Sequence, residues 1–210
     1  FERLIETGEH DPEVLKKCIR TGCVSGKLVP VLCGSSYKNK GVQQLLDAVV
    51  DYMPYPGENG GISIVDEDGQ VIGEQPVTDD APARALAFKV INDQFGTLTF
   101  CRIYSGVIRK GDTLLNVTRG RKERIGRIVE VQADHTREID ETRAGDICAF
   151  VSLKETETGD SLSDPAHPAL LERMRFPDPV ISVSVEPKSR NDVDKLSTAL
   201  YKMVKADPSL

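Results

Sequence analysis

The chain has 210 residues, of which 27 are Lys or Arg and 33 are Asp or Glu, giving a formal net charge of −6. Its 39% hydrophobic content excludes a disordered tail, and its five cysteines are too few for a disulfide scaffold. No apolar run approaches the ~20 residues of a membrane span, so we expect a cytoplasmic globular protein with no membrane partner. The sequence begins at Phe1 without an initiating Met, which suggests a piece of a longer protein.

Residues 11–50 carry helix, strand and helix patterns in turn. Asp11 can cap a helix that is predicted to stop at Gly22, and the apolar run 28–33 is typical of a buried parallel strand. A small-residue turn, 34–41, leads into a second helix over 42–53, whose apolar side chains recur at helical spacing. We therefore predict the last αβα segment of a larger α/β domain.

The middle of the chain changes to β patterns. Residues 57–80 indicate a linker with a short hairpin at Ile62–Ile72 that turns on Asp68-Gly69. Short apolar runs punctuated by Gly-Asp pairs follow, and they predict a closed β-barrel in which Gly126 marks a bulge or corner. The predicted strands are Ala85–Ile91, Leu98–Tyr104, Thr113–Val117, Glu123–Val131, Asp146–Ser152 and Ser161–Leu162.

The pattern changes once more after Pro177. Residues Val180–Val185 alternate as in a strand, and Asn191 can cap a helix with apolar residues at helical spacing. A single strand and helix cannot enclose a core, so this end is expected to be the first half of an α+β domain. The predicted fold class is therefore multi-domain, with a central all-β barrel.

Motifs for catalysis are scarce. The chain has no phosphate loop, no G-x-S-x-G and no H-E-x-x-H. Asn39-Lys40-Gly41-Val42 begins like the guanine-reading N-K-x-D, but Val42 replaces the carboxylate, so we reject it. The acids Glu155, Glu157 and Asp160 are assigned to an exposed loop. The cysteines and histidines are scattered, so we predict no catalytic residue and no metal site.

Positive charge is concentrated in the middle of the chain. Between Ala83 and Val131 there are ten basic and four acidic residues, whereas the remainder has a net charge of −12. The basic stretch 119–127 suits phosphate contacts with a structured RNA. No aromatic residues are interleaved with its cations, which disfavours base stacking. A solvated charged hairpin is the alternative. The candidate RNA-binding residues are Arg119, Arg121, Lys122, Arg124 and Arg127.

A second candidate site is the turn Gly34-Ser35-Ser36-Tyr37. Turns between a parallel strand and a helix are where open α/β sheets bind ligands, and small side chains let backbone N–H groups approach a base or phosphate. An ordinary connecting loop is the alternative.

Several segments resemble one family, bacterial translation elongation factor G, and they occur in the family's order. The turn segment Gly34–Gln43 resembles the end of that family's GTPase domain. The other matching segments are Ala85–Val90, Leu98–Gly106, Gly120–Ile125, Leu153–Asp160 and Val185–Lys188.

The resemblance implies a domain division and a nucleotide contact. Residues 1–58 would be the C-terminal part of a GTPase domain, 59–80 a linker, 81–172 the β-barrel second domain, and 175–210 the start of a split βαβ third domain. By resemblance, the backbone of Ser35, Ser36 and Tyr37 would contact guanine, with Ser36 in place of the usual Ala.

The resemblance also implies a function for the parent protein. It would bind GTP, with Mg held in the missing part, and drive tRNA and mRNA through the ribosome. This chain would be a structural piece without hydrolysis, docking through its barrel on small-subunit rRNA as a monomer with no DNA partner. A ribosomal protection protein or another paralogous translational GTPase is one alternative, and the short loop 92–96 and the linker 69–79 could mark it. A stand-alone RNA-binding β-barrel module is the other.

Overall fold

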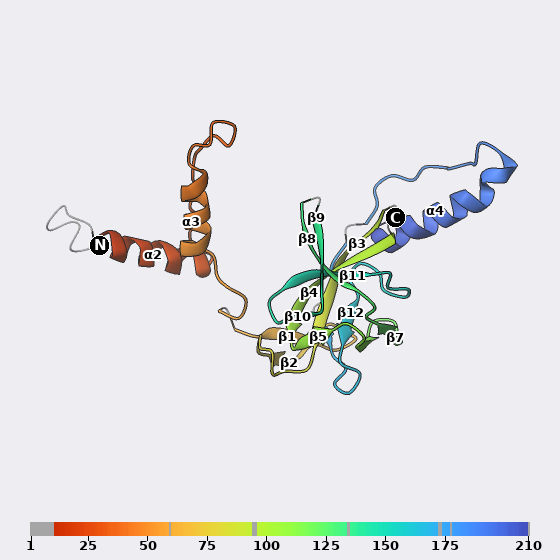
Figure 1. Cartoon of the computed structure of the whole chain (residues 1–210), viewed down its shortest axis with the longest axis horizontal. Coiled ribbons are helices and arrows are strands. Elements are labelled where there is room, and N and C mark those ends of the chain that lie inside the picture. Colours follow the sequence, from red (N-terminus) through yellow and green to blue (C-terminus); the bar gives the residue numbers. More distant parts are fainter. Residues whose placement is uncertain are drawn as a thin grey trace. The chain divides into compact units, whose positions relative to one another are not determined.

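The computed structural model describes residues 11–58, 60–93, 96–133, 135–171, 174–176 and 178–209. The chain divides into two compact units, Phe1–Asn59 and Gly60–Leu210. The described residues of the first unit form two helices, and those of the second form a body of strands followed by a helix (Figure 1). Among the described residues, no helix combines the length and the apolar character that crossing a bilayer requires.

The first unit contains helices α2 (Pro12–Val24) and α3 (Val42–Tyr52). Asp11 caps α2 as predicted, because its carboxylate accepts a hydrogen bond of 3.0 Å from the Glu13 N–H. The helix runs two residues past the predicted stop at Gly22, whose carbonyl instead accepts hydrogen bonds from the chain that folds back after the helix. The predicted second helix is confirmed as α3.

Arg20 ties the two helices of this unit together. Its guanidinium donates to the Asp51 carbonyl at 2.8 Å and pairs with the Glu58 carboxylate at 2.6 Å. The hydrogen bond from Arg20 lowers the pKa of Glu58 below its ordinary value. Only Ala48 is buried among the described residues of this unit, and the contacts of Arg20 join α2 to the end of α3.

The strand predicted at 28–33 is wrong. The described residues of this segment pair with no other strand, and Val29 and Val31 are 83% and 92% exposed. An apolar run becomes a buried parallel strand only where neighbouring strands take up its backbone hydrogen bonds. No described part of this unit supplies such a neighbour.

The second unit begins with the hairpin that the sequence predicted. Strands β1 (Ile62–Val65) and β2 (Val71–Gln75) are antiparallel, and Gly69 has the positive φ of 81° that its turn position requires. The Asp66 carboxylate accepts from the N–H groups of Asp68 and Gln70, which fixes the turn. A short strand, β13 (Leu170–Leu171), pairs with the free edge of β1.

Most other strands form one antiparallel sheet in the order β7-β6-β12-β3-β4-β11-β8-β9, and two more strands pair separately as β10-β5. We call residues 84–163 the β-domain. Its strands are β3 (Arg84–Asp93), β4 (Gly96–Ser105), β5 (Val107–Arg109), β6 (Thr113–Asn116), β7 (Arg121–Arg124), β8 (Ile128–Gln132), β9 (His135–Ile139), β10 (Glu141–Arg143), β11 (Ile147–Val151) and β12 (Ser161–Ser163).

The strands of the β-domain enclose one hydrophobic core. Strand β4 alternates between buried and half-buried residues, as expected of a strand with one face on the core. Phe150 of β11 is the largest fully buried side chain among the described residues. The buried cluster comprises Ala85, Ala87, Cys101, Ile103, Ile108, Leu114, Ile125, Ile128, Cys148, Phe150, Leu153 and Leu162.

The β-domain differs from the sequence prediction in its strand breaks. The segment expected as one strand, 123–131, is two strands, because Ile125 leaves the ladder and exchanges backbone hydrogen bonds with Gly111 and Asp112. The short strands β5, β9, β10 and β13 carry no clear alternation and were not predicted. Within the described residues the pairings leave β7 and β9 as the two end strands. The sheet is therefore not closed by a continuous ladder, unlike the closed barrel that was predicted.

The C-terminal part contains a short 3₁₀ helix, η1 (Arg190–Asp192), and helix α4 (Val193–Ala206). The predicted helix is confirmed, although its N-cap is Asp192 rather than Asn191. The strand predicted over Val180–Val185 is wrong, since none of these residues pairs with another described strand. Two of the alternating side chains, Ile181 and Val183, are 78% and 79% exposed, so the apolar side of this segment is not buried against described residues.

Two of the five cysteines lie opposite each other inside the β-domain core. Cys101 of β4 is the direct cross-strand partner of Cys148 of β11, and both are buried. Burial raises the pKa of the Cys101 thiol well above its ordinary value and raises that of Cys148 to about 12. Among the described residues, no group of three or more His, Cys, Asp or Glu side chains could hold a metal ion.

These pKa shifts predict which thiols react in the folded protein. Because the thiolate is the nucleophile, a thiol with a pKa of about 12 is ionised at pH 8 in only about one molecule in 10⁴. We expect a disulfide reagent at pH 8 to modify the exposed Cys18 and Cys33 quickly, and to reach Cys101 and Cys148 only after unfolding. Mass spectrometry of timed samples, with and without denaturant, measures both rates. Rapid labelling of Cys148 in the native protein would contradict the burial of these two cysteines.

Candidate nucleic-acid interface

The basic stretch lies on the hairpin formed by β6 and β7. The register pairs Leu115 with Lys122 and Asn116 with Arg121, so the turn is made by residues 117–120. Gly120 has a φ of 65°, which a glycine adopts without strain. Strand β7 is an end strand of the sheet. No described strand pairs with its outer edge, so the backbone groups of that edge are open to a partner.

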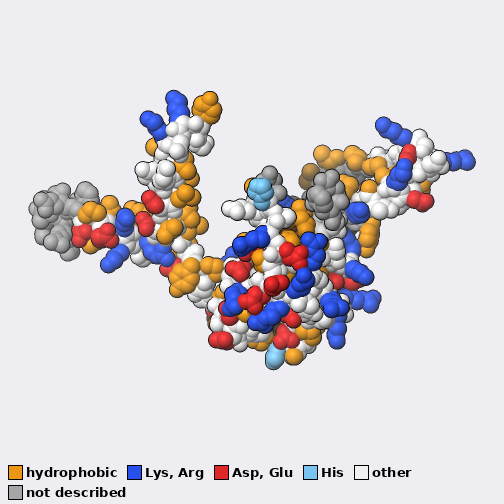
Figure 2. All heavy atoms as spheres, viewed as in Figure 1, with side chains coloured by type: hydrophobic (Ala, Val, Ile, Leu, Met, Phe, Trp, Pro, Cys, Tyr) orange, Lys and Arg blue, Asp and Glu red, His pale blue; other side chains and the backbone are white. Residues whose placement is uncertain are grey.

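Three of the five predicted RNA-binding cations have no partner among the described residues. Arg121, Lys122 and Arg124 are exposed and make no side-chain hydrogen bond or ion pair with any described residue. Lys122 and Arg124 point to the same side of β7, about 7 Å apart along the strand. Lys and Arg side chains stand out on this part of the β-domain in Figure 2. These three residues are called the free cations below.

Arg119, the fourth predicted cation, is bound within the chain. Its Nε donates to Asp160 at 2.7 Å and its terminal nitrogen pairs with Glu157. Partial burial works to lower the pKa of Arg119, but the hydrogen bond and charge of Asp160, together with Glu157, outweigh it and raise the pKa above its ordinary value. Its charge is therefore already balanced by two carboxylates.

Arg127, the fifth predicted cation, is also paired. Its Nε lies 3.1 Å from Glu138, a carboxylate that Lys110 also contacts at 2.6 Å. The pKa of Glu138 is lowered, first by the hydrogen bond from Lys110 and then by Arg127. All three side chains are exposed, and surface pairs of this kind are worth little, so Arg127 is held only loosely by Glu138.

Two buried acids support the hairpin, and the sequence analysis missed the role of both. Asp160 was expected in an exposed loop, but it is only 3% exposed and accepts from Asn116, Arg119 and the Glu157 N–H. Glu123 is 5% exposed and accepts from the backbone N–H groups of Lys154 and Glu155 and from the Thr156 hydroxyl. The alternation along β7, which places Glu123 on the same side as Ile125, was the available signal for Glu123.

The second candidate site, the turn after 28–33, is tightly closed. The Ser35 N–H donates to the Lys40 carbonyl at 2.9 Å, and the Lys40 N–H donates back to Ser35 at 3.0 Å. A Cβ on Gly34 would lie 2.7 Å from the Lys40 carbonyl, so only glycine fits there. Within the described residues the N–H groups of Ser36 and Tyr37 have no hydrogen-bond acceptor, and the Tyr37 side chain is 97% exposed.

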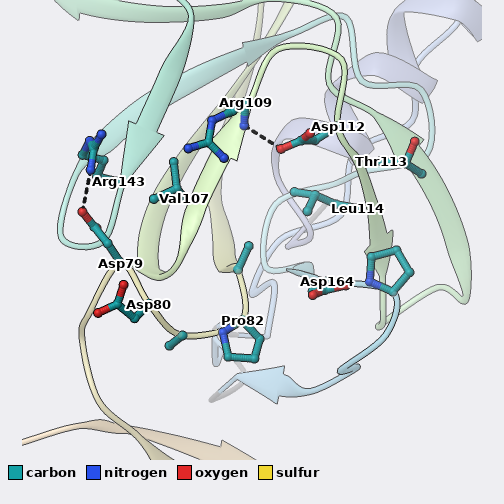
Figure 3. A pocket seen from close by; sticks show the side chains of 13 residues that line it. Asp79, Asp80, Pro82, Val107, Arg109, Asp112, Thr113, Leu114, Arg143 and Asp164 are labelled. Atoms are coloured by element: carbon teal, nitrogen blue, oxygen red, sulfur yellow. Dashed lines mark hydrogen bonds and ion pairs between the residues drawn. The ribbon is translucent and has the colours of Figure 1, made fainter.

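The second unit also contains a groove of mixed charge, shown in Figure 3. Its volume is about 560 Å³, and Asp79, Asp80, Asp164, Arg109 and Arg143 are among the residues that line it. The arginines already have partners: Arg143 pairs with Asp79 at 2.8 Å, and Arg109 pairs with Glu141 at 3.2 Å. The positive charges of the groove are therefore balanced by neighbouring carboxylates, unlike those of the free cations.

Comparison with known proteins identifies both parts of the second unit. The family model for elongation factor Tu domain 2 matches residues 96–163, and the model for elongation factor G, domain III, matches residues 176–210. A crystal structure of a protein from Thermus thermophilus superimposes with a TM-score of 0.74 and 26% identity, covering 100% of this chain and 29% of that chain.

Curated relatives match the chain from end to end. Elongation factor G from Gluconobacter oxydans is 51% identical over 100% of this chain and 31% of its own length, and that from Granulibacter bethesdensis is 51% identical with the same coverage. Elongation factor G 2 from Shewanella frigidimarina is 50% identical, with 30% of its length covered. The chain thus spans about a third of the length of these relatives. Over its whole length the chain therefore matches about a third of bacterial elongation factor G, at about 51% identity.

Proposed function

We propose that this chain is the part of a translational GTPase that docks on small-subunit rRNA during tRNA and mRNA movement through the ribosome. The observation that carries the proposal is the set of free cations on an open strand edge, in a domain matched by the elongation factor Tu domain 2 model. Phosphate oxygens are the natural partners of exposed Arg and Lys that no carboxylate neutralises. Arg119 and Arg127 are paired within the chain and are assigned supporting roles.

The parent protein is proposed to bind GTP and GDP, with Mg, and to hydrolyse GTP. We assign the turn at Ser35, Ser36 and Tyr37 a contact with the guanine base. Two N–H groups that have no acceptor among the described residues, and a turn closed by Gly34, support that assignment, because such donors remain available to a ligand. The sequence contains no phosphate loop, so this chain alone is proposed to be inactive in hydrolysis.

The domain division proposed from the resemblance has residues 1–58 as the end of the GTPase domain, 59–80 as a linker, 81–172 as the barrel and 175–210 as the start of the third domain. The buried cluster of the β-domain supports the third of these, the barrel, since it is a core of its own.

The protein is also proposed to be cytoplasmic and monomeric. Relatives named elongation factor G 1 and elongation factor G 2 are both 51% identical to this chain, so the proposal applies to the main factor and to its paralogues alike.

Salt dependence of RNA binding tests the docking proposal. If the free cations meet three phosphates, the triple variant Arg121→Ala/Lys122→Ala/Arg124→Ala should flatten the slope of log K against log salt by about 2 to 3. The measurement is binding to purified small ribosomal subunits, and to a double-stranded RNA oligonucleotide, between about 50 and 200 mM salt.

A control with the same change in net charge makes this test specific. The triple variant Arg109→Ala/Lys110→Ala/Arg137→Ala removes three cations that already pair with carboxylates, so its slope should change by less than about 1. Equal slopes for the two triple variants would reject the free cations as the docking site. Binding of oligonucleotide but not of subunits would indicate a general RNA-binding barrel instead.

A further inference from the structure

The C-terminal end of α4 rests against the loop that precedes β12. The last carbonyls of a helix have no partner within the helix. Here Thr158 supplies donors for two of these carbonyls. Its N–H donates to the Lys205 carbonyl at 3.3 Å, and its hydroxyl donates to the Ala206 carbonyl at 2.8 Å. The Lys205 ammonium returns a hydrogen bond of 2.5 Å to the Lys154 carbonyl. We call residues 154–158 the seat loop.

The Thr158 hydroxyl also joins the seat loop to the β-domain. While it donates to α4, it accepts a hydrogen bond of 3.1 Å from the Val90 N–H of β3. A hydroxyl can donate and accept at once, whereas a valine of nearly the same shape can do neither. One side chain therefore connects β3 to the end of a helix 48 residues further along the chain.

The opposite side of the seat loop is fixed by the hairpin that carries the free cations. The Lys154 N–H donates to the buried Glu123 at 3.3 Å, while the Lys154 carbonyl accepts from Lys205. The Glu155 N–H and the Thr156 hydroxyl donate to the same carboxylate, at 2.6 and 3.1 Å. One residue, Lys154, thus stands directly between the β7 carboxylate and α4.

We propose that the seat loop is an intramolecular docking site for α4, and that Glu123 acts as its positioning residue. A shift of β7 moves Glu123, which moves the peptide of Lys154 and changes the acceptor that Lys205 uses. Whether α4 stays bound to the seat loop then depends on the position of the basic hairpin. The coupling holds whether or not the hairpin binds RNA, so it does not depend on the proposed function.

Hydrogen exchange of the full chain tests the docking site. In Thr158→Val the amides in the last turns of α4 should exchange roughly fivefold faster, the effect of losing one net hydrogen bond. Thr158→Ser keeps the hydroxyl and should stay within about twofold of the wild type. Equal α4 exchange in Thr158→Val and the wild type would overturn the proposal, as would an α4 that is unprotected in the wild type.

A second pair of variants tests the coupling. Glu123→Gln loses the carboxylate charge that holds the seat loop but keeps its shape, so α4 exchange should rise at least twofold. Lys122→Ala changes the neighbouring exposed residue of β7, which has no partner among the described residues, and should leave α4 exchange unchanged. The coupling is rejected if Glu123→Gln speeds exchange in the seat loop but not in α4, or if both variants affect α4 equally. Exchange at β4 and β11 amides reports that the β-domain is still folded.

Discussion

Replacing Phe150 by Ala should lower the free energy of unfolding of the β-domain by about 3–5 kcal/mol. Phe150 is fully buried in β11, between its ladder partners Thr99 and Ile128. The substitution removes the apolar surface that the ring withdraws from water and leaves a cavity that the surrounding strands cannot fill. Urea unfolding followed by circular dichroism measures the loss as a lower midpoint at an unchanged slope.

The same strand offers a control for this substitution. Ile147 lies three residues earlier in β11, and its side chain is 57% exposed. Ile147→Ala should therefore change the free energy of unfolding by no more than about 0.5 kcal/mol. Equal losses for the two variants would mean that Phe150 does not occupy the centre of the core.

Local patterns predicted the elements whose partners are close in sequence. The Asp68-Gly69 pair predicted the β1–β2 hairpin because a tight turn needs a residue that accepts positive φ, and Gly69 supplies it. Helix α3 followed from apolar spacing alone. In both cases the physical cause of the structure lies within about ten residues, so a single sequence contains it.

The two failed strand predictions show where that reasoning stops. The runs 28–33 and 180–185 have the residues of strands, but a strand exists only where a second strand accepts and donates its backbone hydrogen bonds. Periodicity reports which side of a segment is apolar and not whether a neighbour is present. Val31 and Val180 are exposed because no described residue provides that neighbour.

The candidate interface was predicted in outline but not in its division of roles. The five cations look alike in the sequence, and three of them are free of partners among the described residues. Arg119 differs because Asp160, 41 positions away, comes within hydrogen-bond distance only after β12 pairs with β6. Burial of an acid among exposed-looking loop residues is likewise a property of the fold. Sequence located the positive surface, and tertiary contacts decided which charges remain available.

Replacing Asp160 by Ala should destabilise the hairpin and the loop before β12 together, by about 3 kcal/mol. One carboxylate oxygen accepts hydrogen bonds from Asn116 at 2.8 Å, Arg119 at 2.7 Å and the Glu157 N–H at 2.8 Å. Asn116 is fully buried, so its amide would lose its strongest acceptor with no access to water. The cost arises mainly from these donors left unsatisfied rather than from a lost surface ion pair.

Two further variants separate the acceptor from the charge at Asp160. Asp160→Asn keeps an oxygen that can accept from Asn116 and should cost about half as much, since bonds to a charged group are roughly twice as strong. Glu155→Ala removes an exposed acid from the same loop and should be nearly neutral. Urea midpoints of the three variants give the order. If Asp160→Ala is as stable as Glu155→Ala, Asp160 is a solvated loop acid after all. If Asp160→Asn equals the wild type, the acceptor oxygen alone holds the hairpin and the charge of Asp160 adds nothing to stability.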